Sequence, residues 1–239
     1  MTKIYELPII NISLNIQHVN NTMHKPQLTI PLMKSEATEF AKKESTYPEP
    51  SLFGVTDGKA VGTYLEQKFQ AYLHTKYEYV EGSSAKGIDF PVLGVDIKVT
   101  SIRQPQSSCP FKSARQKIFG LGYNLLVFVY EKTDDETTHT GRLNIHHTVY
   151  IDKTRTADYQ TTSGLLKIME NNGNIDDVLT FFSERMLPID DIQAQSLAEE
   201  ILKKSPQTGY LTISNALQWR LQYSRVIQQA GTVQGIDAL

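Results

Sequence analysis

The chain has a single cysteine, Cys109, among 239 residues, so no disulfide bond can form within it. A chain without disulfides is typical of a reducing compartment, and we expect a cytoplasmic location. No apolar run approaches the roughly 20 residues that a membrane-spanning helix needs, so we expect no membrane partner. The N-terminal residues have neither the basic start nor the long apolar block of a signal peptide.

Neither sign of charge is in large excess. The sequence has 24 Lys and Arg against 26 Asp and Glu, which gives a net charge of −2. This balance argues against a uniformly basic protein that binds polyanions without selection. It leaves room for a locally basic cleft.

The residues that are present fit a globular protein with one large core. The sequence is 40% hydrophobic and 21% charged, and it contains no internal repeat. Helical spacing of apolar residues predicts an amphipathic helix over 58–76. Strands are predicted at 77–80, around Ile88, at 95–99, at 124–132 and at 148–152. Further helices are predicted at 35–45, 112–120, 164–171, 175–186, 191–204 and 212–228.

This order of elements predicts an α/β fold with a mixed central sheet flanked by helices. The apolar run 124–132 is continuous, which is typical of a strand that is covered on both faces. We divide the chain into an N-terminal extension (1–56), a core (57–155) and a helical C-terminal region (156–239) that packs on the core.

The stretch GIDFPVLGVDIKVTS, residues 87–101, places charges in a run that otherwise favours strands. Side chains alternate in a strand, so Asp96 and Lys98 share the face opposite the apolar one. If the segment around Asp89 pairs with this strand, its carboxylate approaches that of Asp96. A divalent cation relieves the repulsion between two carboxylates, and Mg²⁺ prefers one or two carboxylates with water and phosphate oxygens. A lysine beside such an ion favours hydrolysis of a phosphodiester.

Asp89 followed by Asp-Ile-Lys at 96–98 resembles the PD-(D/E)xK motif of the restriction-endonuclease-like nucleases. Ile88 stands where the family frequently has proline. The resemblance extends over about Asp57–Asp152 and includes the order of elements. It implies a type II restriction endonuclease that hydrolyses double-stranded DNA with Mg²⁺ and leaves 5′-phosphate and 3′-hydroxyl ends. A palindromic substrate would imply a homodimer.

The same resemblance implies a role for each motif residue. Asp89 and Asp96 would bind the metal ion, with the Ile97 carbonyl as a third ligand, and Lys98 would position or activate water. Glu66 fits a further acid that family members often carry on the helix before the motif, although a glutamate at the rim of a helix is an equal alternative. For the motif itself, the alternative is an exposed hairpin with solvated charges.

Two segments are candidates for DNA binding. Basic residues without any acid follow the motif strand, and serine and glutamine alternate with them. The C-terminal helix predicted at 212–228 would present Asn, Gln and Arg, the residue types that contact base edges. The candidates are Arg103, Gln104, Gln106, Ser107, Ser108, Lys112, Arg115, Lys117, Asn215, Gln218 and Arg220. A solvated loop is the alternative for the first segment, and a helix that covers the core or forms a dimer contact is the alternative for the second.

Two other functions remain open at this point. One is a DNA repair nuclease of the same fold that recognises DNA structure instead of sequence. The other is a non-catalytic DNA-binding regulator, in which the charges of the motif are only structural.

Overall fold

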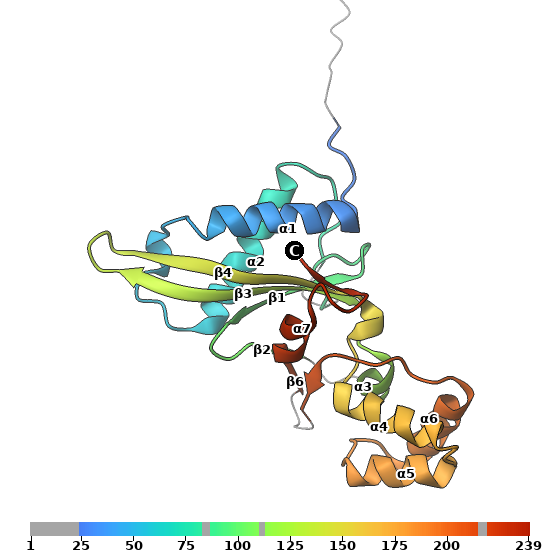
Figure 1. Cartoon of the computed structure of the whole chain (residues 1–239). Coiled ribbons are helices and arrows are strands. Elements are labelled where there is room, and N and C mark those ends of the chain that lie inside the picture. The colour runs from blue at the N-terminus through green and yellow to red at the C-terminus, as the bar shows by residue number, and fades with distance from the viewer. Residues whose placement is uncertain (1–23, 83–86, 110–112, 215–218) are drawn as a thin grey trace, which may run out of the picture.

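The computed structural model describes residues 24–82, 87–109, 113–214 and 219–239 (Figure 1). A central sheet has the strand order β1-β3-β4-β7. Its strands are β1 (Val95–Ser101), β3 (Asn124–Asp135), β4 (Thr140–Ile151) and β7 (Ile236–Ala238). β1 is parallel to β3, and the β3–β4 and β4–β7 pairs are antiparallel. The mixed sheet flanked by helices confirms the predicted fold class.

The strand β3 is covered on both faces, as its apolar sequence predicts. Leu126 and Phe128 face a core formed with the helices α1 (Ile30–Glu44) and α2 (Gly58–His74). Leu125 and Val127 face a second core on the opposite side of the sheet. Figure 1 shows α1 and α2 together on one side of the central sheet.

The α2 helix begins where the sequence supplies a cap. The Asp57 side chain accepts a hydrogen bond from the Lys59 backbone N–H, as an N-cap residue does. Val61, Leu65, Phe69 and Leu73 are buried on one face, as their spacing predicts. Polar residues of α2 lie beside this buried face, and some of them reach the candidate site described below.

A second, smaller sheet has the strand order β2-β6-β5. It consists of β2 (Gln106–Cys109), β5 (Thr212–Ile213) and β6 (Trp219–Gln222). The prediction of one helix over 212–228 is therefore wrong, and among the described residues of this range only those of the short α7 (Ser224–Gln229) are helical. Arg220, Leu221, Gln222 and Tyr223 alternate between polar and apolar, which is the period of a strand. The pairing of β6 with β2 satisfies its backbone groups.

Three longer helices of the C-terminal region form a lobe of their own (Figure 1). They are α4 (Tyr159–Glu170), α5 (Ile175–Glu184) and α6 (Asp191–Lys203), and the short α3 (Arg115–Phe119) packs against them. Asp158, Asn174 and Asp190 cap the three N-termini. The described residues also include two short 3-10 helices, η1 (Pro50–Leu52) and η2 (Lys153–Arg155).

Two predicted strands are not formed. Residues 77–80 make only a single bridge, between Glu78 and Gln27. The segment at Ile88 is not a strand either; the chain turns tightly after Phe90, whose N–H and carbonyl bond to Val95. Both segments are too short to form a ladder, and the turn itself holds Asp89 in place. None of the helices in the described ranges is long and apolar enough to cross a membrane.

Candidate active site

The candidate site lies along the outer edge of β1, which is the edge strand of the central sheet. The turn at 91–94 folds the chain back, and the Asp89 carboxylate accepts a hydrogen bond of 2.7 Å from the Ile97 backbone N–H. The turn, and not a paired strand, therefore brings Asp89 close to β1. This is the approach of Asp89 to Asp96 that the sequence predicts, reached by a different backbone path.

Asp96 and Lys98 point in the same direction from β1. The Lys98 Nζ lies 2.7 Å from the Asp96 Oδ2, and the two side chains are 21% and 6% exposed. Burial raises the pKa of Asp96, and the carboxyl of Asp89 beside it raises this pKa further against the opposing effect of Lys98. Burial acts to lower the pKa of Lys98, but the three surrounding acids, Asp96 first, outweigh it and raise the pKa.

Glu66 faces the same cluster from α2. Burial and then repulsion from Asp89 raise the pKa of Glu66 to about 7. Gln70, one helical turn further on, has its amide nitrogen 3.5 Å from the Asp89 Oδ1. Three carboxyl groups thus converge around one ammonium group, a concentration of negative charge that attracts a cation.

This cluster opens into a cleft with a volume of about 670 Å³. Four segments line it: the N-terminal half of α2, the strand β1, and the strands β2 and β6 of the small sheet. The lining residues are Gly58, Lys59, Gly62, Thr63, Glu66, Lys98, Val99, Gln106, Ser107, Ser108 and Arg220. The cleft therefore joins the charged cluster to a surface with polar and basic side chains.

Nine of the eleven predicted DNA-binding residues fall into three groups. Gln106, Ser107, Ser108 and Arg220 line the cleft. Arg103 and Gln104 are exposed in the turn that follows β1. Lys112, Asn215 and Gln218 lie outside the described residues.

The remaining two candidates, Arg115 and Lys117, lie on α3. The Arg115 guanidinium binds both carboxylate oxygens of Glu200 on α6. Lys117 is only 3% exposed, and burial lowers its pKa against the opposing effect of Asp158. The prediction that Lys117 meets DNA phosphates is therefore wrong, because α3 turns this side chain into the protein.

Sequence reasoning missed Lys59, Thr63 and Gln70. All three are on α2, and their spacing from Glu66 by three, four or seven residues places them on one helix face. Lys59 and Thr63 line the cleft, and Gln70 contacts Asp89. Their alignment with Glu66 is the sequence signal that would have identified them.

The donor set fits a hard divalent cation. In the described part of the chain, no group of three or more His, Cys, Asp and Glu side chains is placed to hold a metal ion. Mg²⁺ does not need one, because it keeps several waters and uses one or two carboxylates with phosphate oxygens. Asp89 and Asp96 are two such carboxylates, and Asp96 contacts Lys98, which lines the cleft.

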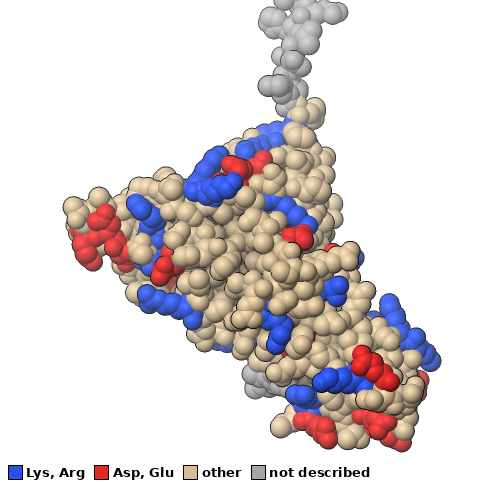
Figure 2. All heavy atoms as spheres, in the orientation of Figure 1, with Lys and Arg blue, Asp and Glu red and all other residues tan. Residues whose placement is uncertain are grey.

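Basic and acidic side chains are interspersed over the face shown in Figure 2, in keeping with the small net charge. The charged cluster at a cleft on the edge of a mixed sheet is consistent with a restriction-endonuclease-like core. Residues 27–238 match the family model described as Type II restriction enzyme NspV. The type II restriction enzyme NspV of Nostoc sp. (strain ATCC 29411 / PCC 7524) is 63% identical over 209 residues, which cover 87% of this chain and 95% of that protein.

The chain therefore belongs to the NspV family of type II restriction enzymes, and it is a type II restriction endonuclease. No solved structure matches it. Membership of this family favours restriction over the two alternatives, a structure-specific repair nuclease and a non-catalytic regulator.

Proposed function

We propose that the chain hydrolyses double-stranded DNA with Mg²⁺ in the cleft beside β1, as a nuclease of the PD-(D/E)xK type. The observation that carries this proposal is the convergence of Asp89, Asp96 and Lys98 on β1, where Lys98 also lines that cleft. A surface hairpin with solvated charges would leave these side chains in open water. Here Asp96 is buried and bonded to Lys98, a costly arrangement that stability alone does not require.

Asp89, Asp96 and the Ile97 carbonyl would hold the metal ion. A bound Mg²⁺ would supply positive charge to the phosphate group at the position where negative charge develops. The hydrogen bond from the Ile97 N–H fixes one oxygen of Asp89, so the carboxylate is oriented before any ion arrives. The short turn after Phe90 keeps this orientation rigid.

Lys98 positions the attacking water and stabilises the negative charge that builds up on the phosphate oxygens. Glu66 assists from α2 by accepting a hydrogen bond from a water molecule in the cluster. The water oxygen bonds to phosphorus and its proton passes to solvent. The bond from phosphorus to the 3′ oxygen breaks, and that oxygen takes up a proton from solvent. The products are a 5′-phosphate and a 3′-hydroxyl.

The DNA backbone would lie along the cleft, where Lys59 provides a cation for phosphate groups, and the exposed Arg103 in the turn after β1 provides a second. A restriction site with twofold symmetry needs one active site for each strand, and we propose that two chains supply them as a homodimer. We also place the enzyme in the cytoplasm, where it would meet its DNA substrate.

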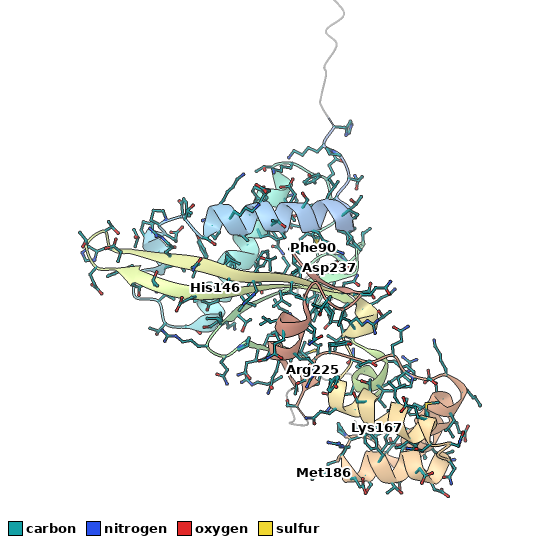
Figure 3. The ribbon with its side chains drawn as sticks, viewed as in Figure 1. Phe90, His146, Lys167, Met186, Arg225 and Asp237 are labelled. Carbon is teal, nitrogen blue, oxygen red and sulfur yellow. The ribbon has the colours of Figure 1, made fainter. Side chains whose placement is uncertain are left out.

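Replacement of Lys98 by alanine tests the mechanism. We expect Lys98→Ala to lower the cleavage rate of plasmid DNA in Mg²⁺ by about 10²- to 10³-fold or more, because charge stabilisation is lost. Binding of the same DNA, measured by fluorescence anisotropy with EDTA, should change only a few fold. The exposed Lys167 of α4, in the separate helical lobe (Figure 3), provides the matched control Lys167→Ala with wild-type cleavage. Unchanged cleavage by Lys98→Ala would overturn the proposed mechanism.

A further inference from the structure

The small sheet presents a polar face and an apolar face. Cross-strand partners point to the same side of a sheet, and the register pairs Gln106 with Gln222 and Ser108 with Arg220. Arg220, Gln222 and Ser108 are exposed, and Gln106 is half-buried. Thr212, the partner of Gln222 on β5, extends the same face. These side chains form what we name the polar face: Gln106, Ser108, Thr212, Arg220 and Gln222.

The opposite face fixes the sheet to the protein. Cys109, Ile213, Leu221 and Tyr223 are all buried in the second core. The Tyr223 hydroxyl forms a hydrogen bond with Ser107, whose side chain lies on this inner face. The polar face is therefore rigidly supported from below, which is what accurate recognition of a substrate requires.

Two buried polar side chains fix the edges of the sheet. The Thr100 hydroxyl on β1 accepts a hydrogen bond of 2.9 Å from the Gln106 N–H and donates one of 3.1 Å to the Gln106 carbonyl. The Asp158 carboxylate accepts one of 2.8 Å from the Ile213 N–H. Thr100 lies two residues beyond Lys98 on the same strand, so β2 is attached directly to the catalytic edge.

From this arrangement we infer that the polar face reads the bases of the DNA in the major groove; the inference rests on the proposed function. A narrow β-ribbon fits the major groove, and arginine binds the O6 and N7 of guanine while glutamine binds the N6 and N7 of adenine. Arg220 makes no ion pair within the described residues, so its guanidinium is available. Arg220 recognises a guanine, and Gln222 with Gln106 recognises an adenine.

The position of this face also limits where the enzyme cuts. Gln106, Ser108 and Arg220 line the same cleft as Glu66 and Lys98. A base that contacts the polar face is therefore only a short distance from the cleaved phosphate. Cleavage falls within the recognised sequence and not at a fixed distance outside it.

Cleavage of duplexes with randomised sequence, followed by sequencing of the ends, tests the inference. The wild-type enzyme should cut at discrete sites that contain the cut position and a fixed guanine. Arg220→Lys keeps the charge but loses the two-pronged hydrogen bond. It should lower kcat/KM on the wild-type site roughly 10- to 100-fold and lose the guanine preference. Gln222→Ala should relax the preference for adenine at another position.

Three measurements separate this role from others. Lys167→Ala on α4 and Gln195→Ala on α6 are exposed controls outside the cleft, and both should keep the wild-type rate and sequence preference. Thermal melting confirms that each variant is folded. The salt dependence of binding distinguishes phosphate contacts, since a lost phosphate contact lowers the slope and weakens all sequences alike.

Two results would overturn the inference, and they differ in what else they affect. If the wild-type enzyme cuts discretely but Arg220→Lys keeps its rate and its guanine preference, Arg220 binds phosphate and only the recognition surface is wrong. If the wild-type enzyme with Mg²⁺ makes no discrete cuts in any duplex, the proposed function fails together with the inference.

Discussion

Glu66, Asp89 and Asp96 concentrate negative charge at a partly buried edge, and all three act on Lys98. Such a cluster lowers the stability of the metal-free protein, because burial disfavours the charged form of each acid. The cost is the expected consequence of a site prepared for a cation and for the charged transition state. We therefore expect that replacing one of these acids by a neutral residue raises the stability of the metal-free protein and lowers its activity.

Glu66→Gln should show this opposition as a function of pH. The pKa of Glu66 in the folded protein, about 7, is above its ordinary value of 4.5. The carboxyl therefore favours folding fully below about pH 4.5 and loses that contribution as the pH rises through 7. With EDTA at pH 8, Glu66→Gln should raise the free energy of unfolding by about 1 to 2 kcal/mol. At pH 4.5 the gain should disappear.

Urea denaturation at the two pH values measures this difference. Glu39→Gln is the matched control, because Glu39 is exposed on α1 beside Lys42. Because this side chain is exposed, the substitution should change the stability only slightly at either pH value. An equal gain for Glu66→Gln at pH 4.5 and pH 8 would contradict the assignment of Glu66 to the charged cluster.

At the scale of elements, the site depends on how closely α2 approaches β1. Gly62 is buried where the helix crosses the strand, and a Cβ placed on it would lie 3.9 Å from the Cβ of Val99. This is ordinary van der Waals contact, so alanine fits, whereas we expect a side chain as large as leucine to press against β1. Glu66 follows one helical turn later, so the crossing point determines the distance between Glu66 and Lys98.

Two substitutions at Gly62 should therefore have opposite outcomes. Gly62→Ala should keep cleavage and stabilise the protein by about 0.5 to 1 kcal/mol, because alanine is the better helix former. Gly62→Leu should push α2 away from β1 and lower the cleavage rate at least about 10-fold. Plasmid cleavage and thermal melting measure both effects. A Gly62→Leu enzyme with wild-type activity would show that the position of α2 is not critical.

The sequence predicts well those elements whose hydrophobic pattern lies within a single segment of the chain. The alternation in β1, the continuous apolar run of β3 and the amphipathic spacing of α2 each reside in one segment. The motif residues Asp89, Asp96 and Lys98 are also close in sequence, so their meeting was predictable. The strand β6 was not, because its partner β2 lies far earlier in the chain and its short alternation competes with a helix-like composition.

The site residues that were missed have the same explanation. Lys59, Thr63 and Gln70 enter the site only through the orientation of α2 on β1. Lys117 was misplaced because the sequence shows its charge but not the rotation of α3, which buries it. Local patterns predict the catalytic motif, whereas packing between distant segments decides which other side chains share the cleft.

At the scale of the whole molecule, the cleft is assembled from both halves of the chain. The α2 helix and β1 come from the first half, and β6 comes from the C-terminal region, whose last strand β7 then pairs with β4 of the central sheet. One chain holds one such charged cluster within the residues described. Cutting both strands of a symmetric site therefore calls for a second copy of the chain, as the proposed homodimer provides.

A mixed dimer tests this arrangement. Wild-type and Lys98→Ala chains, carried on two different affinity tags and co-expressed, should yield a doubly tagged species after purification on both tags. Because only one of its sites retains Lys98, this species should cut a single strand at each recognition site. Supercoiled plasmid should accumulate as nicked circles, whereas the wild-type dimer should yield linear DNA. If each chain acts alone, no doubly tagged species will form, and a mixture of the two proteins will give linear DNA at a rate set by the wild-type concentration.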